Sequence, residues 1–452
     1  MHRSSLIVAL ILTCATIGAS KRLYTNACEK MKQFPGNFGN FGGYTALFST
    51  GNSSNVNADS SIKYSGFGST VFGQSGCGPG GVNGQGWCYQ DINNAVGATY
   101  TRAKWRFQGF PNPTALFCSD LVTPFMIVKN GSDSLAVRID SVGKVNLFLN
   151  GTNQLARTAS ALSANTWYIF QLKVDFKTVG ASYSLRISLP NGGASQTLTD
   201  TSAANATAVP TRWEFGFMGS AASNNSFWMD DLAVNDAQGS YENSYPSDSG
   251  KVIYSLPAAD SARGGWTGGG RGTTNLYKGV NWNPYSEFFC TISQDTATIL
   301  NQQVSSTDNV FLYCQDYTTA GIAASSQILL VQAEVMAGDS LGGSLAGGTN
   351  KQGALLISSN PAQLAESLFT YSEGLRIRSA SECNGGQLDN QWGWAYERTA
   401  PVYLPAVNRS TQPVMMIGRR TAVTGNLFIF QAELIVEYSL LSSAQDAQLI
   451  NY

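Results

Sequence analysis

The sequence predicts an all-β protein of two tandem antiparallel β-sandwich domains, with minor short helices. Hydrophobic and polar residues alternate with a period of two in many segments, which is typical of strands with one buried and one solvated face. Charged residues make up 13% of the chain, against roughly 25% in an average domain. Glycine, serine, threonine and asparagine are frequent between these segments and predict turns. The 452 residues suit two domains of roughly 200 residues each.

The first twenty residues have the pattern of a secretory signal peptide. Arg3 is a positive start, residues 6–12 are apolar, and Gly18, Ala19 and Ser20 are the small residues that a signal peptidase needs. We expect cleavage after Ala19 or Ser20, and a mature protein that is extracellular or carried on a virion surface. No later segment is apolar for long enough to predict a membrane-spanning helix.

Residues 21–238 are expected to form the first domain. Its beginning, to about residue 60, is rich in turn residues, and a second glycine-rich loop is expected at 73–86. Alternation predicts strands in the rest of the domain, and two of them form a hairpin. The expected strands are 99–107, 135–139 with 145–149, 168–176, 183–189, 212–218 and 227–234.

A polar segment at residues 239–250 is the expected linker, and residues 251–452 are the expected second domain. Alternation continues there, most clearly near the end of the chain. The expected strands are 328–336, 354–357, 414–417 and 428–438, with short helices at 361–368 and 442–450.

The cysteines predict disulfide bonds, because an exported chain meets an oxidising environment. Cys77 with Cys88, and Cys290 with Cys314, are plausible pairs, although connectivity does not follow from sequence. An odd cysteine remains, for which we favour a buried thiol over an intermolecular link. Candidate N-glycosylation sites have the Asn-x-Ser/Thr pattern, at Asn52, Asn130, Asn150, Asn205, Asn224 and Asn408.

Two resemblances rest on particular segments. Residues 165–168 (Asn-Thr-Trp-Tyr), the turn at 190–192 (Pro-Asn-Gly) and the strand at 227–236 resemble the concanavalin A-like, laminin-G-type jelly roll. The run from Trp228 through residues 239–257 to residues 281–309 resembles an architecture of phage and viral virion proteins, in which such a domain precedes a second β domain. The second resemblance implies a structural or tail component.

Several classes of chemistry are excluded by residue type. The only histidine is His2, inside the expected signal peptide, so the mature chain has no Ser-His-Asp or Cys-His mechanism. It also has no histidine ligands for a hydrolytic zinc site. A formal net charge of −1 with scattered basic residues argues against nucleic acid and against anionic membranes as partners.

Polysaccharide-degrading activity, as a glycosidase or a lyase, remains an alternative. A glycosidase needs two carboxyl groups roughly 5 to 9.5 Å apart, whereas Glu433 and Glu437 on one strand would be about 13 Å apart. Glu214 has aromatic neighbours, but we interpret it as a surface residue of a half-exposed strand. A lyase would need a tyrosine base beside an arginine or lysine, and composition does not decide this.

Calcium is the one cofactor that the jelly-roll resemblance implies. Laminin-G-type domains often hold it at the rim of the sandwich, and the oxygen ligands that calcium prefers are available in the late strand at Asp230, Asp231, Asn235 and Asp236. Adjacent strand residues point to opposite faces, so Asp230 and Asp231 can chelate together only at a bulge. Polar edge and turn residues are the interpretation that we favour.

Aromatic residues beside amides and carboxylates are the candidate carbohydrate site, since rings stack on sugars and polar groups fix the hydroxyls. Three segments interpreted as loops have this pattern. Their rings are Trp87 and Tyr89, Trp282 and Tyr285, and Trp392 and Trp394. The alternative is that these rings fill the core.

These observations together predict a secreted or virion-surface structural and adhesion protein. It would recognise a carbohydrate or a glycoprotein through its aromatic residues, without covalent chemistry, and homo-oligomerisation would multiply that binding. The alternatives are the polysaccharide-degrading enzyme and a self-assembling coat or filament subunit without a ligand.

Overall fold

The structure is a computed structural model of the chain, and it describes somewhat more than half of the residues. These are 22–29, 46–49, 56–73, 86–92, 95, 97–111, 122–201, 209–218, 226–238, 243–262, 266–268, 275, 277, 300–302, 310–339, 352–358, 370–371, 375–376, 393–398, 402–403, 412–419 and 427–440. Within these ranges the chain forms strands and turns and no α-helix, which confirms the all-β prediction. The expected signal peptide and both expected helices lie outside them.

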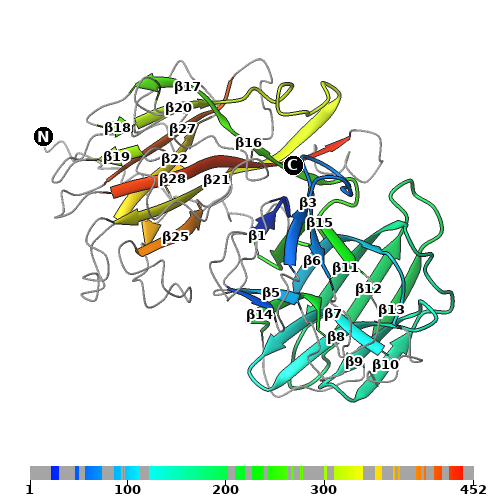
Figure 1. Ribbon diagram of the computed structural model, residues 1–452. Coiled ribbons are helices and arrows are strands. Elements are labelled where there is room, and N and C mark those ends of the chain that lie inside the picture. The colour runs from blue at the N-terminus through cyan, green and yellow to red at the C-terminus, as the bar shows by residue number, and fades with distance from the viewer. Residues whose placement is uncertain are drawn as a thin grey trace, which may run out of the picture.

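Residues 22–236 form two antiparallel sheets that face each other (Figure 1). The eight-stranded sheet runs, in spatial order, β13 (Gln196–Asp200), β12 (Ser182–Ser188), β11 (Trp167–Asp175), β6 (Thr99–Phe107), β15 (Phe227–Asp236), β4 (Ser69–Phe72) and β3 (Val56–Asp59), with β1 (Arg22–Asn26) paired to β15. The seven-stranded sheet runs β10 (Asn153–Arg157), β9 (Val145–Leu149), β8 (Asp133–Asp140), β7 (Val122–Asn130), β14 (Arg212–Phe217), β5 (Gly86–Asp91) and β2 (Ala46–Ser49).

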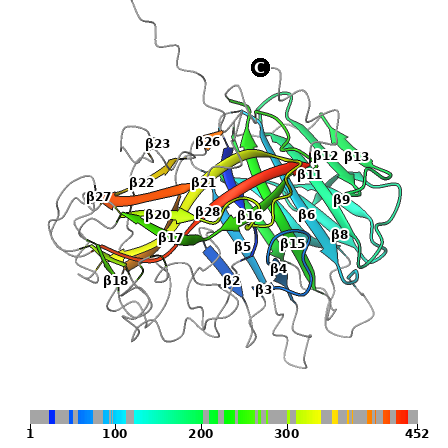
Figure 2. The same cartoon turned by 90° about the horizontal axis from the view of Figure 1, so that it is seen from above.

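Residues 251–440 form two further antiparallel sheets (Figure 2). One runs β18 (Trp266–Gly268), β19 (Leu300–Gln302), β28 (Leu427–Leu440), β21 (Ser326–Asp339) and β25 (Gly393–Arg398), with β16 (Lys251–Ser255) on β28 and β26 (Val402–Tyr403) on β21. The other runs β17 (Pro257–Ala262), β20 (Val310–Cys314), β27 (Val414–Arg419), β22 (Gln352–Ser358) and β23 (Thr370–Tyr371), with β24 (Leu375–Arg376) on β22.

The long strands form where alternation predicts them, because their apolar faces meet in a core between the sheets. Phe107, Phe125 and Phe170, from three different strands, lie within 6.1 Å of one another, ring centroid to ring centroid, in edge-to-face contacts. Each ring is fully buried, which stabilises the fold by roughly 1.5–3 kcal/mol per side chain. The second pair of sheets encloses its own core, which includes Leu312, Val331 and Leu434.

The beginning of the chain differs from the turn-rich segment that we expected, since β1, β2 and β3 lie there. In β1 the buried residues include Arg22, Thr25 and Asn26. Apolar and polar residues therefore do not alternate along this strand, and its sequence does not predict it. Its place in the sheet depends on pairing with β15, where Asn26 lies opposite Leu232. The glycine-rich loop at 36–43 lies outside the described residues.

One edge of β15 changes partner part-way along the strand. Its first half pairs with β4 and its second half with β1. Between them the register with β6 shifts between Asp230 and Ala233, and Asp231 adopts a left-handed backbone conformation with φ of 51°. This is a β-bulge, which re-aims a side chain.

The segment that joins the two sandwiches is attached to the first one. The Pro246 and Ser247 carbonyl oxygens accept hydrogen bonds from Gln171 and Arg102, both at 2.8 Å. The chain then enters β16, which pairs with β28 of the second sandwich. Residues 246–250 are therefore held against the outer face of the eight-stranded sheet.

Candidate functional site

The outer face of the seven-stranded sheet carries one of the three predicted aromatic segments. Alternation along β5 turns Cys88 into the core, where it is fully buried, and turns Trp87 and Tyr89 outward, where both are half-buried. Their ring centroids lie 6.2 Å apart with an angle of 37° between the planes. We expected a loop here, and the structure corrects this to a strand, so the two rings have a fixed separation on a rigid sheet.

The neighbouring strand β14 places a cation directly on this aromatic pair. The Arg212 guanidinium carbon lies 3.8 Å from the centroid of the Tyr89 ring, a cation–π contact. Its Nε atom donates to Asp91 Oδ1 at 2.6 Å. Burial by itself disfavours the charged form, but the hydrogen bond with Asp91 outweighs it and raises the pKa of Arg212. The guanidinium is therefore held charged over the ring.

A second ion pair borders the same rings. Glu214 lies directly opposite Tyr89 in the register of β14 and β5, and its Oε1 atom is 2.7 Å from the Lys129 ammonium group. Only 2% of Glu214 is exposed, so the expectation of a surface glutamate is wrong. Lys129 compensates the charge of this buried carboxylate.

This face combines aromatic surface with fixed polar groups. Trp87 and Tyr89 offer partly exposed rings, Arg212 lies over the Tyr89 ring, and Asp91 and Lys129 are charged groups in ion pairs on the same face. Sugar recognition uses both: rings contact the apolar face of a pyranose and polar groups fix its hydroxyls.

The structure does not describe the side chains of the other predicted aromatic residues. Trp282, Tyr285 and Trp392 lie outside the described residues. Trp394 lies on β25, opposite Gly338 of β21, and its side chain is not described. A carbohydrate role for these four residues stays a prediction.

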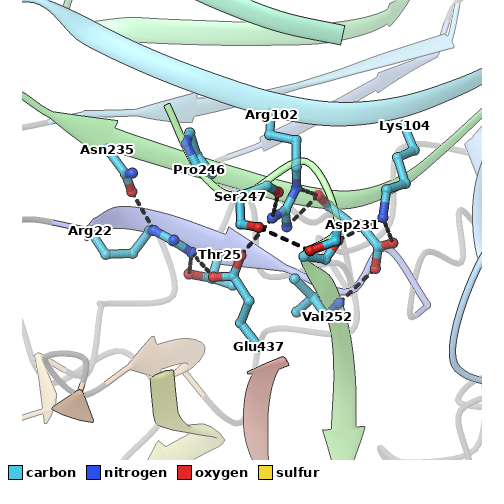
Figure 3. Close-up of polar contacts among 12 residues, drawn as sticks. Arg22, Thr25, Arg102, Lys104, Asp231, Asn235, Pro246, Ser247, Val252 and Glu437 are labelled. Atoms are coloured by element: carbon cyan, nitrogen blue, oxygen red, sulfur yellow. Dashed lines mark hydrogen bonds and ion pairs between the residues drawn. The ribbon is translucent and has the colours of Figure 1, made fainter. Parts of the chain in front are cut away.

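Of the four candidate calcium ligands, Asp231 and Asn235 lie at the junction of the sandwiches (Figure 3). Through the bulge, Asp230 and Asp231 both reach the outer side of the sheet, but protein donors occupy their oxygens. Asp230 accepts the backbone N–H groups of Tyr64 and Ser65, at 2.8 and 3.1 Å. Asp231 accepts the Val252 N–H at 2.7 Å and pairs with the Lys104 ammonium group at 2.7 Å.

The remaining two candidate ligands have similar partners. Asn235 accepts a hydrogen bond from Arg22 at 2.5 Å, and its amide donates to the Ser244 carbonyl at 2.9 Å. Asp236 accepts the Gln238 N–H at 2.9 Å, as in an Asx turn. Among the described residues, no three acidic, cysteine or histidine side chains are grouped to hold a metal ion. The carboxylates join the chain segments of the junction.

Glu437 of β28 is the residue of the second sandwich that forms ion pairs at this junction. Its carboxylate pairs with Arg22 of β1 and, at 2.7 Å, with Arg102 of β6. All three side chains are fully buried. Glu433 and Glu334, on opposed positions of β28 and β21, are also buried, at 0% and 1% exposure, so a polysaccharide does not reach this pair.

The predicted cysteine bonds and most glycosylation sites fall partly or wholly outside the described residues. Cys88 and Cys314 are both buried in the cores, and burial raises the pKa of the Cys314 thiol. Their expected partners, Cys77 and Cys290, lie outside, so both bonds stay predictions. Of the asparagines, Asn150 is exposed in a turn, and Asn130 donates from its side chain to the Val209 carbonyl. The four others, Asn52, Asn205, Asn224 and Asn408, lie outside the described residues.

A search of the described residues for a helix of sufficient length and hydropathy to cross a bilayer found none. No known family matches this chain, and no curated protein sequence matches it.

Comparison with solved structures found remote similarities to part of the chain. The endo-beta-1,4-glucuronan lyase from the fungus Trichoderma reesei is 10% identical with a TM-score of 0.33, over 47% of this chain and 95% of that one. The basic winged bean lectin, solved with Tn-antigen, is 11% identical with a TM-score of 0.30, over 47% and 96%. The alginate lyase vAL-1 from Chlorella virus is 9% identical with a TM-score of 0.31, over 43% and 94%.

These solved structures are jelly-roll lectins and polysaccharide lyases, and at such identities the likeness concerns the fold alone. The sheets of the chain itself define the protein as an antiparallel β-sandwich protein, in which a second β-sandwich follows the first. The resemblance to virion structural proteins stays a prediction.

Sequence reasoning missed the partners of the aromatic pair. Arg212 and Asp91 are 121 residues apart in the chain, and only strand pairing brings them together. The sequence pattern Arg-Trp-Glu-Phe at residues 212–215 was only a weak indication of a binding site. It became informative once β14 was known to pair with β5.

Proposed function

We propose that this is an extracellular or virion-surface carbohydrate-binding protein, and that the saccharide binds on the outer face of the seven-stranded sheet. The observation that carries the proposal is the pair of outward, half-buried rings of Trp87 and Tyr89, with Arg212 held over the second ring. Trp87 and Asp91 are four positions apart on one face of β5, about 13 Å, so an oligosaccharide with one ring on Trp87 would extend along the strand past Tyr89 to bring hydroxyls to Asp91. Export is part of this proposal, and N-terminal sequencing of the mature chain tests cleavage after Ala19 or Ser20.

The rigidity of the surface supports recognition of a saccharide. The rings project from a strand inside a seven-stranded sheet, paired on both sides, so little conformational entropy is lost when a ligand binds. A flexible loop, which the sequence had suggested for this segment, would lose more.

A glycan array probed with the purified mature protein tests the proposal. We expect selective binding by the native protein and loss of that binding in Trp87→Ala and Tyr89→Ala. Arg157→Gln is the matched control, because Arg157 is an exposed cation on β10 at the far edge of the same sheet. Absence of binding to every glycan, or unchanged binding by both aromatic variants, would contradict the proposal and favour a coat or filament subunit.

A polysaccharide lyase is the second candidate, and one observation favours it. A lyase needs a tyrosine beside a cation, and Arg212 lies on the ring of Tyr89. In that role the deprotonated tyrosine oxygen would take the proton next to a uronate carboxylate, a C=C double bond would form as the glycosidic C–O bond breaks, and the same tyrosine would return the proton to the departing oxygen. A guanidinium would neutralise the carboxylate.

Ultraviolet absorbance of the unsaturated product, after incubation with polyuronates, separates the two candidates. The binding proposal predicts no absorbance change. An increase that disappears in Tyr89→Phe would identify a lyase instead, because this variant keeps the ring and loses only the hydroxyl.

A further inference from the structure

We propose that the opposite face of the first sandwich carries a second binding site, for an acidic saccharide, centred on Trp167, Arg106 and Trp228. This site lies on the outer face of the eight-stranded sheet, so it is separate from the Trp87 and Tyr89 face and goes beyond the function proposed above.

These three residues form one row across three neighbouring strands. Trp167 of β11 lies opposite Arg106 of β6, and Arg106 lies opposite Trp228 of β15. The Arg106 guanidinium carbon is 4.9 Å from the centroid of the Trp228 ring. Trp228 is only 6% exposed, so it supports Arg106 from within the sheet, while the partly exposed Trp167 provides the stacking surface beside this charged group.

Hydrogen bonds fix the orientation of two of the three residues in the row. Arg106 donates from Nε to the Asn165 carbonyl at 3.2 Å and from Nη2 to Asn165 Oδ1 at 3.0 Å. The Trp228 indole N–H donates to Asp59 at 2.9 Å. Arg106 and Trp228 therefore keep their positions without a ligand.

A third ring borders the row from the loop at residues 60–68. Tyr64 contacts Trp167 edge-to-face, with ring centroids 5.9 Å apart. The Lys104 ammonium group lies 4.0 Å from the centroid of the Tyr64 ring, and that of Lys251, on the second sandwich's first strand, lies 5.4 Å from it. The site is thus positioned beside the junction of the two sandwiches.

Buried carboxylates hold this loop in place. Asp230 accepts the N–H groups of Tyr64 and Ser65, and Asp231 accepts the Ser65 hydroxyl at 2.6 Å. Glu29 accepts the Phe67 N–H at 2.7 Å. The residues that we first considered as calcium ligands thereby fix the loop that carries Tyr64.

The surface remains open to a ligand. Trp167, Arg106 and Tyr64 are each partly exposed, and Lys63 is exposed. Phe67 is 40% exposed and is one of three large hydrophobic side chains exposed among the described residues. Exposed rings at one place on an otherwise polar face indicate a binding surface.

The charge of this surface specifies an acidic ligand. Arg106, Lys63 and Lys251 are its accessible cations. The nearby carboxylate of Asp59 is already bonded to Trp228 and to the Ser61 hydroxyl. A saccharide with carboxylate or sulfate groups would complement the cations, while its ring contacts Trp167.

Calorimetric titration of the full mature protein tests this site with three probes: a uronate oligosaccharide, a sulfated oligosaccharide and a neutral gluco-oligosaccharide. We expect at least one acidic probe to bind more tightly than the neutral one, and added salt to weaken that binding. The first two probes distinguish a carboxylate ligand from a sulfate ligand. Trp167→Ala and Arg106→Gln should each weaken the acidic probe by roughly tenfold.

Arg186→Gln is the matched control, because it removes an exposed cation from the same face of the same sheet, on β12, and should leave the affinity unchanged. If near-UV circular dichroism shows that either site variant is misfolded, Lys63→Gln replaces it, since Lys63 is exposed, and should weaken the acidic probe by roughly threefold. Equal affinity for acidic and neutral probes, or wild-type affinity in folded Trp167→Ala and Arg106→Gln, overturns the proposal. Loss of the acidic probe only in Trp87→Ala also overturns it, and would leave the first site standing.

Discussion

Glu437 of β28 and Arg102 of β6 lie 335 residues apart in the chain, yet their side chains pair at 2.7 Å inside the junction between the sandwiches. Arg22 of β1 pairs with the other carboxylate oxygen. One glutamate of the second sandwich thus pairs with two buried arginines of the first (Figure 3). Buried ion pairs therefore connect the two sandwiches, in addition to the covalent chain.

Removal of the Glu437 charge should destabilise the protein strongly. Glu437→Gln keeps the shape of the side chain but leaves two buried guanidinium groups without their carboxylate. Breaking a buried ion pair costs about 3–5 kcal/mol, and equilibrium denaturation in urea measures it.

Lys177→Gln is the control for this prediction. It breaks an ion pair with Asp175 in which 54% of the lysine side chain is exposed, and pairs at the surface contribute only about 0–1 kcal/mol. Equal unfolding free energies of Glu437→Gln and Lys177→Gln would contradict this account of the junction.

The Glu437 carboxylate also makes the stability of the protein depend on pH. Burial alone would raise the pKa of Glu437, but Arg22 and Arg102 outweigh it and hold the pKa below its ordinary value of 4.5. The unfolded chain therefore binds the proton first as the pH falls. The stabilisation is fully present above about pH 4.5 and is lost as the pH falls through the folded value.

The difference in unfolding free energy between the native protein and Glu437→Gln measures this contribution alone. This difference should be constant near neutral pH and should become smaller at acidic pH. Comparison with the variant is needed because Asp230 acts in the opposite direction: burial and the charge of Asp231 raise its pKa, so its contribution falls as the pH rises. A difference that does not change with pH would show that Glu437 has the same pKa in the folded protein and in the unfolded chain, which would contradict this account.

Gly250 should not tolerate a side chain. A Cβ atom there would lie 1.9 Å from Arg102 Nη1 and 2.9 Å from Glu437 Oε1, so the ion pair would have to move. We expect Gly250→Ala to cost about 1–3 kcal/mol, as overpacking of a dense interior does. Gly73→Ala is the control, because its nearest neighbour would be the Ser226 hydroxyl at 3.9 Å. Thermal unfolding of both variants checks this, and similar melting temperatures would count against it.

Asp231 should stabilise the junction as an anion. Asp231→Asn suits the left-handed backbone at φ of 51°, because asparagine tolerates that region. The variant therefore removes only the negative charge that pairs with Lys104. We expect the free energy of unfolding to fall by about 3–5 kcal/mol. Since protein donors occupy these oxygens, a calcium chelator should leave the melting temperature of the native protein unchanged. A clear decrease with the chelator would restore the calcium hypothesis for these residues.

The sequence predicted the parts of the fold that apolar alternation encodes. Tyr168, Phe170 and Leu172 face the core in β11 as their spacing indicates. In contrast, β1 was missed because Arg22 and Thr25 are buried through polar partners. Most of those partners, such as Glu437 and Asn235, come from distant segments, and local pattern does not contain them.

The candidate site was predicted in residue type and missed in geometry. Trp87 and Tyr89 were identified as aromatic candidates, but glycine-rich sequence before them suggested a loop where β5 lies. The pairing of β5 with β14, which supplies Arg212, depends on the whole sheet. Likewise, the placement of Asp230 and Asp231 depended on a bulge that strand periodicity does not reveal.

A crystal structure of the mature protein, soaked with an oligosaccharide selected on the glycan array, tests the central claim most directly. We predict density for a sugar ring on the outer face of β5 and β14, in contact with Trp87 and Tyr89 and within hydrogen-bonding distance of Asp91 or Lys129. Density for the same oligosaccharide elsewhere, with the Trp87 and Tyr89 face unoccupied, would contradict the assignment of this face as the carbohydrate site.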